Sequence, residues 1–177
     1  MANVRDAMNA RFEWTRECLK TPEGQRAWVS LMTRAVADAT KWESVFRVHD
    51  SGDLFSPTYV RMWIEVCKAL SHVRFWFPTR AWQQPIGNGA FRVMGQGDAT
   101  MDAIRVLAAL SNVTVRPSAL NFGEEAPRVA GLAAGSTAVD DEPVDAHLCP
   151  APSQNGECGA CRHCWMSPAV AVAYHRH

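Results

Sequence analysis

Apolar residues recur every three or four positions in four stretches of the chain, which is the spacing of a helix with one buried face. These stretches are residues 3–20, 22–40, 57–70 and 99–110. Thr21 and Ser56 each stand directly before a proline, and a capping side chain followed by proline favours a helix start. The pattern therefore predicts four helices, two of which precede any strand.

Short apolar runs alternate with the later helices and indicate strands. The expected strands are SVFRVHD at 44–50, HVRFWFPTR at 72–80, NVTVRPSAL at 112–120 and the closing AVAVAYHRH at 169–177, with GSTAV at 135–139 as a further candidate. The glycine-rich stretch PIGNGAFRVMGQGD at 85–98 is expected to be a loop. It lacks the spacing of a dinucleotide-binding fingerprint.

This alternation of strands and helices is typical of right-handed crossovers and a parallel sheet. A chain of 177 residues is short for a full eight-fold barrel, which needs about 250. We therefore predict an α/β fold with a partial or open (βα) barrel, TIM-barrel-like, and keep a small doubly wound sheet as the alternative. The expected organisation is one domain over residues 1–177, with N-terminal helices at 1–43, βα units at 44–148, a cysteine-rich loop at 149–165 and a closing strand at 166–177.

Charge and composition exclude some classes of partner. The formal net charge is zero, from 18 basic and 18 acidic residues, so no global field favours nucleic acid or an anionic membrane. No apolar run reaches the roughly 20 residues that span a bilayer, and the charged N-terminus does not resemble a signal peptide. The chain has six cysteines, and we expect a reducing cytoplasm and a metal site in place of three disulfides.

Polar and charged side chains follow the predicted strands. They are His49, Asp50, Asp53, Arg80, Arg116, His175, Arg176 and His177. Because the carboxyl ends of parallel strands share one rim, we expect His49, Asp50, Asp53, Arg80 and Arg116 to converge there as candidate catalytic residues around a small anionic ligand. His49 or Asp50 would then transfer a proton. The alternative is structural, with the aspartates capping a turn and the arginines pairing with them.

Four cysteines lie close together near the C-terminus, as Cys149-x8-Cys158-x2-Cys161-x2-Cys164. Three cysteines at two-residue gaps turn the backbone around one centre, and Cys149 can supply a fourth sulfur. Such spacing suits a [4Fe–4S] cluster, and tetrahedral zinc is the alternative.

The sequence also predicts the roles of two further residues in this motif and of the two remaining cysteines. His163 is expected beside the site and not as a ligand, and Trp165 is expected to shield the site from water. Cys18 and Cys67 lie on apolar helical faces and are expected to be core thiols.

Several of these motifs together resemble a family of small proteins encoded by tailed bacteriophages, prophages and plasmids. They are FRVHDSGDLFSPTYVRMWIEVCKAL, HVRFWFPTRAW, NVTVRPSAL, CPAPSQNGECGACRHCW and VAYHRH. The resemblance covers nearly the whole chain. It implies a βα-barrel-like fold, an iron–sulfur cluster on Cys149, Cys158, Cys161 and Cys164, and expression in the cytoplasm of a bacterial host. Longer members carry an extra N-terminal segment with its own cysteine pair, so a function that needs that segment is not expected here.

Two functions remain open from the sequence. The first is a redox or cluster-dependent enzyme, with the cluster beside the polar rim of the strands. The second is a binding or regulatory protein for a host factor, nucleic acid or nucleotide, in which a [4Fe–4S] cluster or zinc is structural; the neutral net charge does not favour nucleic acid. The fold also resembles radical S-adenosylmethionine enzymes, but four thiolates would saturate a cluster and leave no iron for that cofactor, which argues against such chemistry.

Overall fold

The computed structural model describes residues 4–49, 53–88, 90–95, 97–140 and 145–175. The four predicted helices are confirmed as α1 (Val4–Cys18), α2 (Pro22–Ala39), α3 (Pro57–Ala69) and α4 (Ala99–Ala108). Thr21 and Ser56 cap α2 and α3, because their hydroxyls accept hydrogen bonds from the Gly24 and Tyr59 amides at 3.0 and 3.2 Å. Within the described residues, no helix is both long enough and apolar enough to cross a membrane.

Parallel strands form two small sheets. The first contains β1 (Val45–Arg47), β2 (Arg74–Thr79) and β5 (Val113–Pro117) in the order β1-β2-β5. The second contains β6 (Ser136–Val139), β7 (Ala146–Leu148) and β8 (Ala171–His175) in the order β6-β8-β7. One parallel bridge between Ser118 and Ser136 joins them. The α/β class is confirmed. The described strands close no barrel, so the barrel-like curvature stays a prediction.

The stretch expected to be a glycine-rich loop is instead an antiparallel hairpin. It consists of β3 (Gln83–Gly87) and β4 (Ala90–Val93). Gly87 and Asn88 have φ of 95° and 50°, the left-handed conformation that a tight hairpin turn requires. Asparagine followed by glycine is the sequence signal for such a turn, and the interpretation of this stretch as a loop overlooked it.

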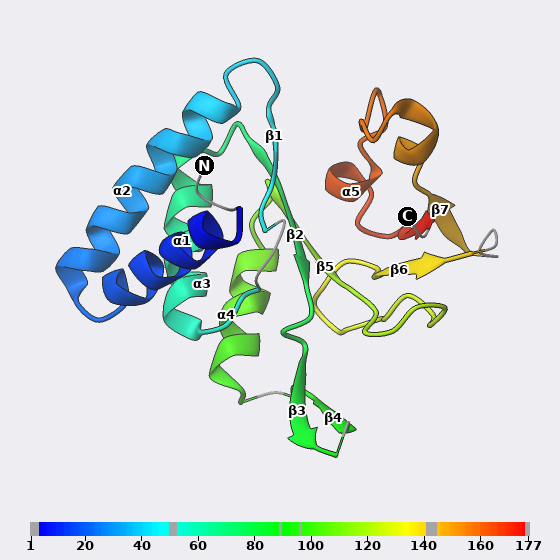
Figure 1. Ribbon diagram of the computed structural model, residues 1–177, viewed down its shortest axis with the longest axis horizontal. Coiled ribbons are helices and arrows are strands. Elements are labelled where there is room, and N and C mark those ends of the chain that lie inside the picture. The colour runs from blue at the N-terminus through cyan, green and yellow to red at the C-terminus, as the bar shows by residue number, and fades with distance from the viewer. Residues whose placement is uncertain (1–3, 50–52, 89, 96, 141–144, 176–177) are drawn as a thin grey trace.

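The β1-β2-β5 sheet separates two regions of the molecule (Figure 1). Helices α1–α4 lie on one side of it, and α5 (His163–Met166) with strands β6–β8 lies on the other. Side chains alternate along β2, because successive residues of a strand point to opposite faces. Phe75 and Phe77 belong to the core beneath the helices, whereas Trp76 belongs to a separate cluster with Cys164 and Trp165. We call these the helix face and the cysteine face.

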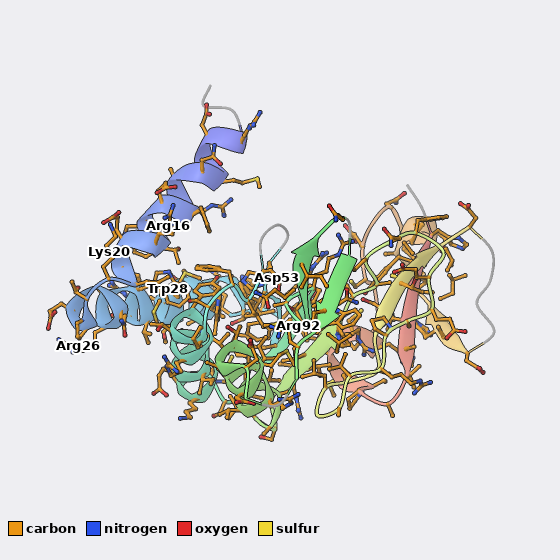
Figure 2. The ribbon with its side chains drawn as sticks, turned by 90° about the horizontal axis from the view of Figure 1, so that it is seen from below. Arg16, Lys20, Arg26, Trp28, Asp53 and Arg92 are labelled. Carbon is orange, nitrogen blue, oxygen red and sulfur yellow. The ribbon has the colours of Figure 1, made fainter. Side chains whose placement is uncertain are left out.

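Helix α1 projects outward in Figure 2, which labels Arg16 on it, and its Phe12 ring contacts Phe55 with centroids 5.6 Å apart. Its C-terminal end is attached to α2, where Trp28 Nε1 donates a hydrogen bond to Thr15 Oγ1 at 3.2 Å. A Cβ atom at Gly24 would lie 2.6 Å from the Cys18 carbonyl oxygen, so only glycine permits this approach of the two helices.

Candidate functional site

The C-terminal segment brings four cysteines together on the cysteine face. Cys164 lies in a buried cluster with Trp76, Trp165 and Val172, and Cys149 and Cys158 pack against this cluster. The thiols also affect one another electrostatically: Cys149 and Cys161 act on Cys158, and Cys149 and Cys158 act on Cys164. All six cysteines are free thiols, so no disulfide competes for these sulfurs.

The site has a buried end and a more exposed end. Cys164 is only 6% exposed, while Cys149, Cys158 and Cys161 are half-buried in a largely exposed segment that includes the 3₁₀ helix Ala151–Gln154. Burial raises the pKa of the Cys164 and Cys158 thiols, and the neighbouring thiols add to this shift. Metal binding would therefore release protons here, because cysteine ligates metal as the thiolate.

Arg116 connects the sheet to the cysteine segment from below. It is fully buried, and its two terminal nitrogens donate to four backbone carbonyls, those of Ala134, Val170, His163 and Ser167. Burial lowers the pKa of its guanidinium, and the nearby Cys164 opposes that shift. These bonds correct the expectation that Arg116 binds a ligand at the rim, because its guanidinium is committed to positioning the segment that carries Cys164.

Two further arginines lie near the exposed end of the site. The Arg47 guanidinium lies 4.9 Å from the centroid of the Trp76 ring, and Arg162 is 3.3 Å from Glu43. Both arginines act to lower the pKa of Cys158, against the larger effect of burial. Together with Arg116, which acts on Cys164 in the same way, they partly offset the effect of burial on the thiol pKa values.

Two side chains contact the sulfurs directly. His147 Nε2 lies 3.4 Å from Cys161 Sγ, and Tyr174 Oη lies 3.4 Å from Cys164 Sγ. His147 also stacks on His163 with ring centroids 3.8 Å apart. Burial, followed by the charge of His163, lowers the pKa of His147, so its neutral form is favoured. The expectation for His163 fits this position beside the cysteines, but the contacts do not test whether it ligates.

The geometry and chemistry of the donors discriminate between possible occupants. In the described part of the chain, no three His, Cys, Asp or Glu side chains lie close enough to hold one metal ion. Tetrahedral zinc with Zn–S bonds of about 2.3 Å would need sulfurs about 3.8 Å apart. The thiolates of a [4Fe–4S] cluster each bind a different iron atom, and therefore form a wider set.

Buried donors without acceptors lie in the same region. Trp76 Nε1, Arg116 Nε and His163 Nδ1 are buried and have no hydrogen-bond partner among the described residues. Trp76 contacts the cysteines, His163 is next to Cys164 in sequence, and Arg116 is near Cys164. Buried polar nitrogens normally have partners, so an acceptor-rich, negatively charged group fits this set of thiols better than neutral thiols alone.

The predicted rim residues lie mainly on the other face of the sheet. Asp53 accepts hydrogen bonds from the Leu54 and Arg80 amides, both at 2.7 Å, and from the Thr79 hydroxyl. Asp53 thereby connects the loop after β1 to the end of β2. Figure 2 shows Asp53 beside the strands. The ends of β1 and β2 do meet, and the Asp53 carboxylate has the structural turn-forming role that was the alternative interpretation. Asp50, Arg176 and His177 lie outside the described residues.

His49 is the most unusual residue of this rim. It has a φ of 66°, rare for a residue other than glycine, and its Nε2 lies 3.0 Å from Tyr59 Oη. Its ring is near Phe77 and Trp63, so burial lowers its pKa to about 4. These neighbours belong to the helix face. His49 thus packs on the opposite side of β2 from Trp76 and Cys164, and the expectation that a cysteine-bound cluster shares one polar face with His49 and Asp53 stays a prediction.

Comparison with known proteins identifies the family. The family model described as Gene product 88 matches residues 1–167. The chain belongs to the Gene product 88 family. The Gene 88 protein of Mycobacterium phage D29 is 49% identical over 43 residues, which cover 24% of this chain and 18% of that protein. The Gene 88 protein of Mycobacterium phage L5 is 41% identical over 58 residues, which cover 29% of this chain and 24% of that protein.

These alignments span less than a quarter of either mycobacteriophage protein. No solved structure matches the chain. The expected resemblance to a phage-encoded family is confirmed, and the Gene product 88 match does not test the iron–sulfur interpretation or name a reaction.

Sequence reasoning missed three residues of the site in this Gene product 88 protein. Trp76 was assigned only to a strand, and His147 and Tyr174 were not connected with the cysteines. All three are aromatic residues on strands of the cysteine face. The available signal was their position: His147 stands two residues before Cys149, and Tyr174 lies in the strand that the cysteine segment leads into.

Proposed function

We propose that this phage-family protein binds one [4Fe–4S] cluster through Cys149, Cys158, Cys161 and Cys164, and acts in electron transfer or in cluster-dependent binding in the host cytoplasm. The observation that carries the proposal is the convergence of four free thiols on one face of the sheet, around Trp76. Thiols this close in a chain without disulfides are typical of a metal centre.

Charge balance supports an anionic centre. The guanidinium of Arg116 is fully buried and, among the described residues, pairs with no carboxylate. A buried cation is costly unless a negative charge compensates it. Four thiolates around an iron–sulfur cluster carry net negative charge, so they would compensate Arg116, with Arg47 and Arg162 at the exposed end.

The cluster is favoured over zinc by the spacing and the nature of the donors. Three cysteines at two-residue gaps with a more distant fourth are typical of a [4Fe–4S] cluster, whose usual ligands are four thiolates. A cluster bound here would supply one-electron redox chemistry. The chain's own residues would hold it, shield it with Trp76 and Trp165, and attach the C-terminal segment to the sheet through Arg116.

The position of the cysteine site favours a role that does not involve the residues at the ends of the strands. His49 and Asp53 belong to the helix face, so a ligand bound there would be separated from the cluster by β1 and β2. Electron exchange would instead take place at the half-buried cysteines, in the largely exposed segment. A host protein is therefore the partner that fits an electron-transfer role, and a small anionic ligand at the rim fits less well.

Metal analysis of anaerobically purified protein tests the proposal. We expect about four iron atoms and four sulfides per chain, and a brown protein that absorbs broadly near 400 nm. Cys164→Ala should lose most of this iron, because it removes the most buried thiol. The matched control is Cys67→Ala, since Cys67 is a buried thiol on the helix face. It should keep its iron.

The outcomes are distinct. A colourless protein with one zinc per chain would replace the cluster by structural zinc on the same residues. Equal iron content in Cys164→Ala and Cys67→Ala would show that iron is not bound at these cysteines and would refute the assignment. Full-length protein is used throughout.

A further inference from the structure

The buried end of the cysteine site contains the hydroxyl of Tyr174, which is not one of the proposed metal ligands. Tyr174 lies on β8, and its ring is stacked on Trp76 with an interplanar angle of 19° and centroids 6.4 Å apart. This stacking directs Oη to within 3.4 Å of Cys164 Sγ. A thiolate has no proton to donate, so the tyrosine hydroxyl is the donor once Cys164 is deprotonated.

Arg116 lies near the same residue, because it donates to the carbonyls of His163 and Ser167. Its pKa responds to Cys164 and to Tyr174, which places all three groups in one electrostatic network. The carbonyls of His163 and Ser167 that it holds flank Cys164 in the chain, so its position relative to that sulfur is fixed by the backbone. At this depth, water provides little screening, and each donor acts strongly.

The other sulfurs lack this combination. Cys161 has a contact with His147, and Cys158 has the more exposed arginines, but both lie in the largely exposed segment. Cys164 alone is classed as buried among the four. Negative charge on its sulfur is therefore stabilised by protein groups and not by solvent.

We infer that Tyr174 and Arg116 are positioning residues that stabilise negative charge on the Cys164 sulfur, and thereby favour the reduced, more negative state of the metal centre. This inference rests on the proposed function, because it concerns a sulfur that would bind the cluster. Hydrogen bonds to cluster sulfurs are among the factors that set reduction potentials. Reduction adds one electron and makes the centre more negative, so the donors stabilise the reduced state more than the oxidised state. They raise the potential.

The two tyrosines of the chain provide a matched test. Tyr174→Phe keeps the ring on Trp76 and removes only the hydroxyl. Tyr59→Phe is the same chemical change on the helix face, where the hydroxyl contacts His49. An anaerobic redox titration of the full-length, cluster-loaded protein measures the midpoint potential of each.

We expect the reduced-to-oxidised ratio of Tyr174→Phe at a fixed potential to fall about tenfold, which is a midpoint about 59 mV more negative for a one-electron couple. Tyr59→Phe should match the wild type. The midpoint is measured per cluster, so it stays informative if Tyr174→Phe retains less iron. Arg116→Lys, which keeps the charge but not the planar set of donors, should shift the midpoint in the same direction.

Each result is decisive. An unchanged midpoint in Tyr174→Phe with iron retained overturns this inference and leaves the proposed function intact. If the wild type instead holds zinc, Tyr174→Phe should lose zinc to a chelator about tenfold more readily than Tyr59→Phe, and equal loss overturns the inference. Protein that binds neither iron nor zinc overturns both.

Discussion

The two faces of the β1-β2-β5 sheet are stabilised in different ways. On the helix face, large apolar side chains of α2, α3, α4 and the strands form one buried core. On the cysteine face, the buried cluster that the described residues form is small and consists of Trp76, Cys164, Trp165 and Val172. One strand contributes to both, because neighbouring residues of β2 point in opposite directions. The helix face is therefore held by burial of apolar area, and the cysteine face needs other sources of stability.

Polar contacts to the backbone replace apolar area on the cysteine face. Trp165 Nε1 donates to the Phe46 carbonyl at 3.1 Å, and Thr114 Oγ1 donates to the Trp165 carbonyl at 2.8 Å. Arg116 adds its four carbonyl contacts. Such hydrogen bonds fix the orientation of the groups that they join, but each contributes little to the free energy of unfolding, about 1 kcal/mol. We conclude that a bound metal centre would contribute a large share of the stability of this half.

The largest expected effect comes from Phe77→Ala on the helix face. The Phe77 ring is fully buried beside Trp63, so its removal leaves a cavity, and we expect a loss of about 4 kcal/mol in the free energy of unfolding. Urea denaturation measures it. Because this core does not involve the cysteines, the loss should be equal in metal-loaded and chelator-treated protein. A loss that depends on metal would show that the two faces are one cooperative unit.

Arg116→Met is the corresponding change on the cysteine face. It removes the hydrogen bonds to four carbonyls, of which those of His163 and Ser167 keep a backbone amide donor, and we expect a loss of about 3 kcal/mol. Hydrogen exchange should increase in α5, β6 and β8 while α3 and α4 stay protected. Equal deprotection of both halves would contradict the separation of the two faces.

Acid should weaken the helix face through His49. Burial keeps the pKa of this imidazole at about 4 in the folded protein, below its ordinary value of 6.5. Between these values the unfolded chain binds a proton that the folded chain does not, so stability falls as the pH decreases from 6.5 to about 4. Allowing for partial exposure, the loss is about 2 kcal/mol.

The variant His49→Asn isolates this effect. Asparagine tolerates the positive φ of position 49, and it does not titrate in this range. Urea denaturation at pH 7.5 and at pH 4.5 should show a smaller loss in His49→Asn than in the wild type. Identical losses would mean that His49 is protonated in the folded protein.

The helix face was largely predictable from the sequence. Local signals determine its helices: apolar spacing, the Thr21 and Ser56 caps, and the prolines that follow them. Its strands were recognised from apolar runs of length typical for buried strands. The hairpin of β3 and β4 was not predicted, because the many glycines of this stretch were taken to indicate a loop and the asparagine–glycine pair in its sequence was not used as a turn signal.

The cysteine face was less predictable, because it depends on contacts between distant parts of the chain. The spacing of the four cysteines indicated a common site, but not which face of the sheet they occupy. The role of Arg116 could not be predicted, since its partners lie 18 to 54 positions later in the sequence. The strand Ala146–Leu148 is short and its side chains are half-buried, so it carries no alternating pattern to detect.

The smallest effects are expected from removing one hydroxyl group on each face. Thr114→Val removes the bond to the Trp165 carbonyl, and Ser56→Ala removes the cap of α3; each should cost about 1 kcal/mol. The two variants differ in where the cost appears. Thr114→Val should speed the loss of metal to a chelator, because Trp165 follows Cys164 directly, whereas Ser56→Ala should leave that rate unchanged. Equal rates of metal loss would mean that this bond does not help to hold the cysteine segment in place.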